Sequence, residues 1–233
     1  MDAIRDNILA IREEMAKACA QAGRREDAVK LLAATKMNDR DRIRAAIEAG
    51  VDLCGENRVQ EFQEKLSQDA YRGCPVHFIG HLQKNKAKFL VGNVDLIQSV
   101  DSIPLLETID RLAEKKELIQ DILLEINIGG ETAKSGIRPE EADEFSARIG
   151  EFPHLRLRGF MTIPPISEEI HGNLRYFAKM YNLYVDIKAK KYDNTNIDCL
   201  SMGMSDDFAD AIKEGATLIR VGTGIFGARQ YVK

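Results

Sequence analysis

The sequence predicts an α/β protein whose strands close into a single (β/α)8 TIM barrel. Eight short apolar segments alternate along the chain with segments of helical pattern, and parallel strands need such helical crossovers. Closure is expected because a barrel leaves no strand edge unpaired. With 233 residues, 44% hydrophobic and 30% charged, the chain suits one barrel domain that extends over residues 1–233.

An additional helix is expected before the barrel. Ile4, Ile8, Ile11 and Met15 recur at helical spacing ahead of Gly23, so one face of this helix is apolar. No strand-like segment precedes it. The helix should therefore pack on the outside of the barrel.

The eight predicted strands are short apolar or mixed runs bounded by polar or turn residues. They are expected at residues 31–36, 51–56, 77–80, 94–100, 122–128, 155–161, 197–203 and 217–222. Helical signals cover residues 41–50, 57–66, 104–116, 139–150, 169–190 and 205–215. The main alternative is an open doubly wound sheet, which usually has a GxGxxG turn after its first strand. No such turn follows LLAATK.

Composition excludes several classes of function. The net charge of -4 and the lack of a long Lys/Arg run argue against nucleic-acid and membrane-surface partners.

The four cysteines form no CxxC pair, so reduced thiols are expected instead of zinc or redox motifs. No metal site is expected, since Gly80 and a strand end separate His77 from His81. Charges near the amino terminus and the absence of a long apolar stretch predict a cytoplasmic protein.

Lys36 ends the first predicted strand and is the main candidate for chemistry. In the alternation Leu32, Ala34, Lys36 the lysine faces the barrel interior, with a small alanine beside it. Desolvation of a lysine amine lowers its pKa and frees it to attack a carbonyl. The alternative is a side chain that extends from the strand end into solvent.

Catalytic and binding residues of a barrel lie at the carboxyl ends of its strands. Phosphate is commonly held by the loops after strands seven and eight, which read SMGMSDD and RVGTGIFG here. Gly222 allows the backbone to approach an anion, while Ser201 and Thr223 supply hydroxyl donors. Arg220 is either a ligand contact or the ion-pair partner of Glu125, and spacing alone does not decide between them.

The motifs at these strand ends carry a family resemblance. AATK at Lys36, GENRVQE, HFIGHLQKNK, KSGI, LRGFMTIP and the long block LSMGMSDDFADAIKEGATLIRVGTGIFG resemble those of the pyridoxal phosphate homeostasis protein family over nearly the whole chain. The resemblance implies a barrel similar to the amino-terminal domain of alanine racemase. It also implies that pyridoxal 5'-phosphate (PLP) is bound as a Schiff base to Lys36, with a role in vitamin B6 and amino-acid homeostasis.

The resemblance also assigns roles to individual residues. Ser201, Gly222 and Thr223 match the phosphate-binding positions, and Arg220 matches the residue that faces the pyridine nitrogen. The remaining positions match residues that line the ring pocket: Asn57, His81, Met161 and Met204.

A PLP-holding protein without catalytic activity is favoured over two alternatives. An arginine at the pyridine nitrogen disfavours its protonation, which makes the cofactor a poor electron sink. Racemization needs a second acid/base group, which the similar racemases supply from a separate carboxyl-terminal domain that we do not expect here. The alternatives are a low-activity amino-acid racemase and a Schiff-base aldolase that uses Glu125. Expected partners are PLP, amino acids and transiently bound apo-enzymes, with the protein itself a monomer.

Overall fold

The computed structural model describes residues 2–227. Its strands form one closed parallel barrel in sequence order, and β8 pairs with β1. The strands are β1 (Lys30–Ala34), β2 (Leu53–Glu56), β3 (Val76–Phe78), β4 (Leu96–Val100), β5 (Gln120–Ile126), β6 (Leu155–Thr162), β7 (Thr195–Ser201) and β8 (Leu218–Val221). Each overlaps one predicted strand, so the barrel prediction is confirmed.

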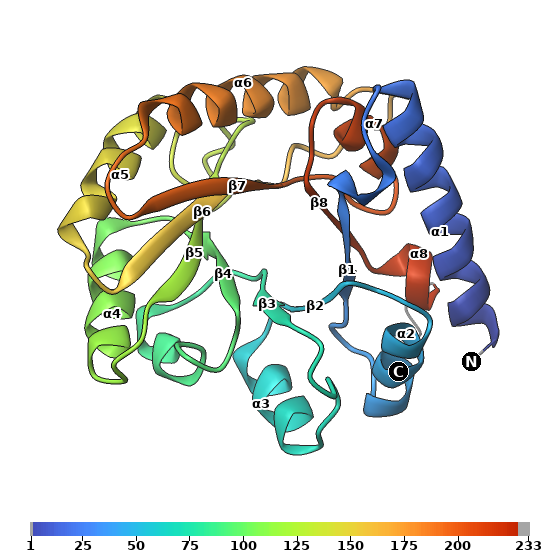
Figure 1. The fold of residues 1–233 in the computed structure, drawn as a ribbon, viewed down its shortest axis with the longest axis horizontal. Helices are drawn as coiled ribbons and strands as arrows, with labels where there is room; N and C mark the ends of the chain where they lie inside the picture. Colours follow the sequence, from blue (N-terminus) through green and yellow to red (C-terminus); the bar gives the residue numbers. More distant parts are fainter. Residues whose placement is uncertain (1, 228–233) are drawn as a thin grey trace.

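Helices surround the barrel on its outer side (Figure 1). The α-helices are α1 (Asp2–Gln21), α2 (Arg40–Glu48), α3 (Val59–Ser67), α4 (Ile103–Glu114), α5 (Ala142–Arg148), α6 (Leu174–Lys190), α7 (Phe208–Lys213) and α8 (Thr223–Phe226). Within residues 2–227, four 3-10 helices complete the connections: η1 (Glu26–Ala28), η2 (Lys84–Phe89), η3 (Pro139–Glu141) and η4 (Ile149–Glu151). Between β3 and β4 the crossover is the short η2.

The helix predicted at residues 169–190 begins later, at Leu174. His171 adopts a positive φ of 62°, which a right-handed helix does not allow. The segment between β6 and α6 is therefore a loop. It follows the carboxyl end of β6, which is the end of the barrel where Lys36 follows β1.

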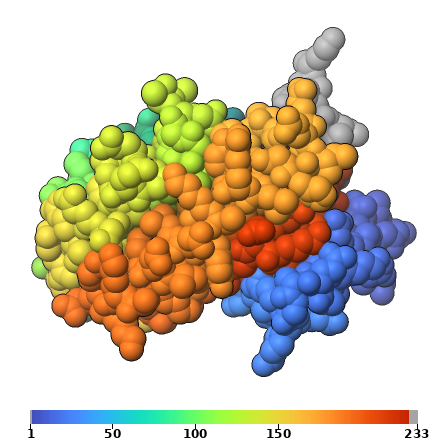
Figure 2. Space-filling model, turned by 90° about the horizontal axis from the view of Figure 1, so that it is seen from above, coloured from blue at the N-terminus to red at the C-terminus, as the bar shows by residue number. Residues whose placement is uncertain are grey.

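The amino-terminal helix α1 supports the last elements of the chain. Its apolar face is buried and contacts α7 and α8. Asn7 adds a hydrogen bond of 2.9 Å from its side-chain amide to the carbonyl of Ile225. The space-filling view shows the amino-terminal segment in blue beside the carboxyl-terminal segment in red (Figure 2). The predicted extra helix thus holds α8 against the end of β8.

Two different layers of side chains face the two sides of the strands. The large apolar core lies between the barrel and the helices. The barrel interior holds smaller apolar clusters, one formed by Leu32, Leu53 and Leu218 and the other by Leu96, Leu123 and Met161. Buried polar side chains occupy the rest of the interior, as described below. No helix among residues 2–227 is long and apolar enough to span a membrane.

Candidate functional site

A tight turn follows β1 and carries Lys36. The amide of Thr35 continues the pairing with β2 by donating to Gly55 O at 2.9 Å, and the amide of Asn38 donates back to Thr35 O at 3.1 Å. Met37 has a positive φ of 59°, which is uncommon outside glycine. The turn places half-buried Lys36 at the carboxyl end of β1, where the sequence predicted it.

A buried ion pair lies directly behind this turn. The Lys65 ammonium is 2.7 Å from Glu56 Oε1, and the two side chains are 8% and 0% exposed. Thr35 contacts both partners, since its carbonyl accepts from Lys65 at 2.9 Å and its hydroxyl donates to Glu56 at 2.5 Å. Burial raises the pKa of Glu56, and Lys65 and Thr35 oppose that shift. Because each buried charge needs the other, the pair fixes the residue that precedes Lys36.

The far side of the turn is tied to α3 and α8. The amide of Met37 donates to Glu61 Oε2 at 2.8 Å. Arg42 donates from its Nε to Asn38 Oδ1 at 2.9 Å and from a terminal nitrogen to the carbonyl of Phe226. The turn that carries Lys36 is therefore connected to α8, the helix that begins in the second glycine-bearing loop.

Barrel closure brings that loop beside Lys36. In the parallel pairing of β1 with β8, Ala33 lies opposite Val221, so Gly222 follows beside Ala34. A Cβ atom at Gly222 would lie 3.4 Å from Ala34 Cβ, which is ordinary contact distance and shows how close the two strand ends are. Exposed Thr223 then begins α8. Lys36, Gly222 and Thr223 thus lie at neighbouring strand ends.

The hydroxyl beside this loop belongs to Ser205, which is not among the residues predicted from the sequence. The amide of Gly224 donates to Ser205 Oγ at 3.2 Å. Ser201, which was selected, is fully buried and bonded to Gln98 and Arg220. Ser205 stands two residues after Gly203 in the same predicted loop, so the criterion that selected Ser201 applies to it equally.

Arg220 is buried, with 4% of its surface exposed, and its hydrogen bonds go to neutral oxygens. It donates to Ser201 Oγ at 2.6 Å and to Thr162 O at 2.8 Å. Within residues 2–227 no ion pair joins it to Glu125, whose carboxylate accepts from Ser135 instead, at 3.2 Å. Desolvation lowers the pKa of Arg220 to about 10. The guanidinium therefore stays charged at neutral pH.

The other predicted ring-pocket residues lie in varied surroundings. Asn57 follows β2, and its Oδ1 is buried without a hydrogen-bond partner among the described residues. His81 is largely exposed, with Nδ1 3.7 Å from Asp101. Met161 packs in the barrel interior, whereas Met204 is partly exposed in the loop after β7. These residues end or follow strands β2, β3, β6 and β7, so they lie at the same end of the barrel as Lys36.

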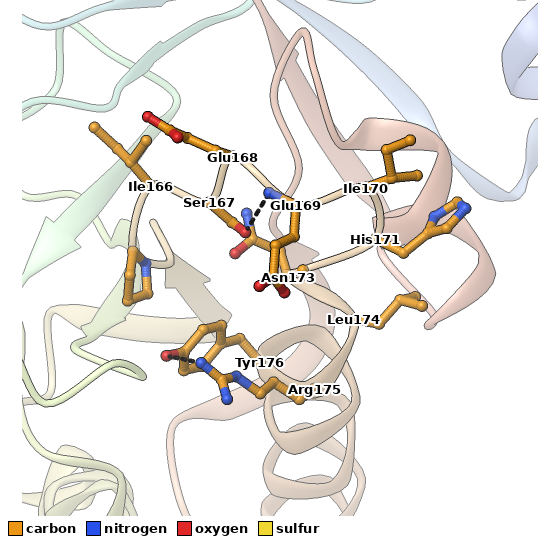
Figure 3. Close-up of a pocket in the computed structure, with 12 residues that line it drawn as sticks. Ile166, Ser167, Glu168, Glu169, Ile170, His171, Asn173, Leu174, Arg175 and Tyr176 are labelled. Atoms are coloured by element: carbon orange, nitrogen blue, oxygen red, sulfur yellow. Dashed lines mark hydrogen bonds between the residues drawn. The ribbon is translucent and has the colours of Figure 1, made fainter.

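Two cavities of the molecule are lined by other residues. One of about 730 Å³ is enclosed by the loop between β6 and the start of α6. Figure 3 shows that its side chains come from one continuous segment, in which Ile166 and Ile170 are almost fully exposed. A second cavity of about 460 Å³ lies at the amino-terminal ends of the strands, where His77 and Arg158 line it. Among residues 2–227, no group of three His, Cys, Asp or Glu side chains could hold a metal ion.

Comparison with known proteins agrees with this geometry. The family model of the alanine racemase N-terminal domain matches residues 1–230. The chain is 42% identical to the pyridoxal phosphate homeostasis protein of Aquifex aeolicus over 95% of this chain and 96% of the relative. The chain belongs to the pyridoxal phosphate homeostasis protein family, as its motifs predicted.

Solved structures show the same fold. A protein from Bifidobacterium adolescentis superposes with a TM-score of 0.90 at 39% identity, covering 97% of this chain and 95% of that one. PipY of Synechococcus elongatus, solved with PLP bound, has a TM-score of 0.82 at 30% identity and covers 96% and 100% of the two chains. The likeness extends over nearly the full length of each protein.

Removal of Glu56 should destabilise the fold strongly. A Glu56→Ala substitution leaves the Lys65 ammonium buried without its carboxylate, and we expect unfolding free energy to fall by about 3–5 kcal/mol. Urea unfolding followed by circular dichroism measures the change. Glu48→Ala is the control, because Glu48 pairs with Arg72 at the surface and should cost no more than about 1 kcal/mol. Equal losses in the two variants would contradict this role of the buried pair.

Proposed function

We propose that this protein binds PLP, with Lys36 as its covalent anchor, and acts in PLP and amino-acid homeostasis. The observation that carries the proposal is the meeting of the Lys36 turn with the Gly222 loop at the ends of β1 and β8. PLP offers an aldehyde to an amine and a phosphate to a glycine-bearing loop. Membership of the homeostasis family and the PLP-bound structure of PipY support the same cofactor.

The residues present fit the phosphate of PLP. Gly222 has no side chain, so an anion can approach its backbone closely, and the loop leads into the first turn of α8. The hydroxyls of Thr223 and Ser205 lie in this region as donors. We propose that Ser205 adjoins the phosphate directly, while Ser201 acts through Arg220.

The buried Arg220 suits the ring nitrogen of PLP. PLP serves as an electron sink when its ring nitrogen is protonated. A guanidinium that remains charged at neutral pH donates hydrogen bonds and disfavours that protonation. The orphaned Oδ1 of Asn57 offers an acceptor at the neighbouring strand end. This set of residues binds and orients the cofactor but does not promote carbanion chemistry.

The bond to Lys36 would be reversible. The lysine amine adds to the aldehyde carbon and one water molecule leaves, which forms the Schiff base. The amine of a free amino acid displaces the lysine from the same carbon, or water restores the aldehyde and the free lysine. We propose that this exchange lets the protein hold PLP and release it to apo-enzymes. We also propose that the protein works as a monomer with one domain.

Covalent attachment is tested by reduction with borohydride. We expect the PLP-loaded protein to gain one reduced PLP adduct on the peptide that contains Lys36, as measured by mass spectrometry. Lys36→Ala should abolish the adduct, because the neighbouring amine of Lys65 is buried and held by Glu56 at 2.7 Å. Lys88→Ala, which removes an exposed lysine of η2, should leave it intact. An adduct that persists in Lys36→Ala would refute the assignment.

Phosphate recognition is tested by comparing PLP with pyridoxal, which lacks the phosphate. We expect Ser205→Ala to weaken PLP binding roughly 10-fold, as for a lost hydrogen bond to a charged group, and to leave pyridoxal binding unchanged. Fluorescence titration gives both affinities. Ser67→Ala, on the exposed end of α3, serves as the control. An equal loss for both ligands would place Ser205 outside the phosphate site.

The absence of catalysis is testable directly. We expect the PLP-loaded protein to racemize alanine no faster than free PLP, because Arg220 disfavours a protonated ring nitrogen. Chiral chromatography of long incubations measures the rate. Racemization that exceeds the free-PLP rate and disappears in Lys36→Ala would favour a racemase instead.

A further inference from the structure

A continuous chain of hydrogen bonds crosses the barrel interior from Arg220 to His77. Arg220 on β8 donates to Ser201 on β7 at 2.6 Å. Ser201 donates to Gln98 Oε1 on β4 at 2.7 Å, and Gln98 Nε2 lies 2.9 Å from His77 Nδ1 on β3. All four side chains are buried. The chain therefore connects strands on both sides of the barrel.

The direction of every hydrogen bond in the chain follows from Arg220. A guanidinium can only donate, so Ser201 accepts from it and must pass its own proton onward. Gln98 Oε1 receives that proton, which turns the amide nitrogen toward His77 and makes Nδ1 an acceptor. A reversed Gln98 amide would leave the Ser201 proton without an acceptor.

His77 suits the end of this chain because it is neutral. Burial lowers its pKa to about 3; Lys30 and Arg158 lower it further and Asp121 opposes them. A neutral imidazole has one nitrogen without a proton. With Nδ1 as that acceptor, the proton lies on Nε2, and the orientation of Gln98 is fixed over the ordinary pH range.

Burying these four polar side chains costs desolvation free energy, so the chain of hydrogen bonds is not explained by stability alone. Buried polar groups stabilise a fold little compared with apolar side chains of similar volume, and each must be paired. Leucines fill the neighbouring interior positions. What the chain does provide is a fixed guanidinium, held at one nitrogen by Ser201 and at the other by Thr162 O.

We propose that Gln98 is a positioning residue for Arg220, acting through Ser201 and anchored by His77, and that it sets how Arg220 meets the ring nitrogen of PLP. This inference rests on the proposed PLP site. It assigns a role to a strand residue that lies outside the loops of the pocket. Gln98 contacts the Ser201 hydroxyl and the His77 ring, so its effect on the cofactor is indirect.

The test compares two buried glutamines. Gln98→Leu breaks the chain of hydrogen bonds. Gln120→Leu removes a glutamine of β5 that is 2% exposed and that, among the described residues, is bonded only to backbone groups of residues 92, 94 and 121. We expect both variants to lose stability. Only Gln98→Leu should weaken PLP binding, by roughly 10-fold, and shift the pH midpoint of the visible absorption of bound PLP.

A conservative substitution of Gln98 distinguishes its hydrogen bonds, which position Arg220, from its packing in the barrel interior. Gln98→Glu keeps an acceptor for Ser201, and neutral His77 can move its proton to Nδ1 to pair with the second oxygen. We expect this variant to bind PLP within about threefold of the unmodified protein. Ser201→Ala removes the bridging hydroxyl with little change in volume and should weaken PLP binding as Gln98→Leu does. If Gln98→Leu does not fold, the PLP affinity of Ser201→Ala tests the positioning role instead.

The outcomes separate this inference from the proposed function. If Gln98→Leu and Ser201→Ala both keep the PLP affinity and the pH midpoint of the unmodified protein, the positioning role is overturned while PLP binding stands. Equal changes of affinity and pH midpoint in Gln120→Leu would also overturn it, because the loss of any buried glutamine would then weaken PLP binding. Failure of the unmodified protein to bind PLP would instead refute the proposed function.

Discussion

The pairing of β1 with β8 is the interaction on which the site depends. These strands come from opposite ends of the sequence, and their parallel register sets Ala33 opposite Val221. The residues that continue past each strand end, Lys36 and Gly222, meet only because the barrel closes. Helix α1 strengthens the junction by packing on α7 and α8. An open sheet of the same strands would leave the lysine and the glycine loop at its two separate edges.

Two buried cations near this junction have different surroundings, and the difference indicates different uses. Lys65 is matched by the carboxylates of Glu56 and Glu61, so its charge is compensated within the protein and serves to hold the Lys36 turn. Arg220 is bonded to a hydroxyl and a carbonyl. A buried guanidinium with neutral partners retains positive potential for a ligand. The first cation supports the fold, and the second belongs to the proposed cofactor pocket.

The fold was predictable from the sequence because the spacing of apolar residues within a short segment already distinguishes a strand from a helix. Strand and helix alternation defined the barrel, and the inward alternation of β1 pointed to Lys36. Contacts across the barrel were not predictable in this way. Gln98 and Ser201 both face inward, but no local pattern shows which inward residues of distant strands touch. Cys54 and Cys74 likewise lie with their sulfur atoms 3.8 Å apart although nothing in their spacing indicates it. Ser205 was missed for another reason, since it lies in the loop where a hydroxyl donor was expected, and Ser201 in the same loop was chosen instead.

The most direct test of the central claim is a crystal structure of the protein with PLP bound. We predict a covalent bond from Lys36 Nζ to the cofactor, with the phosphate at Gly222, Thr223 and Ser205. The ring nitrogen should lie within hydrogen-bond distance of Arg220. Ordered PLP at another strand end, or PLP in this pocket with its phosphate turned away from the Gly222 loop, would contradict it.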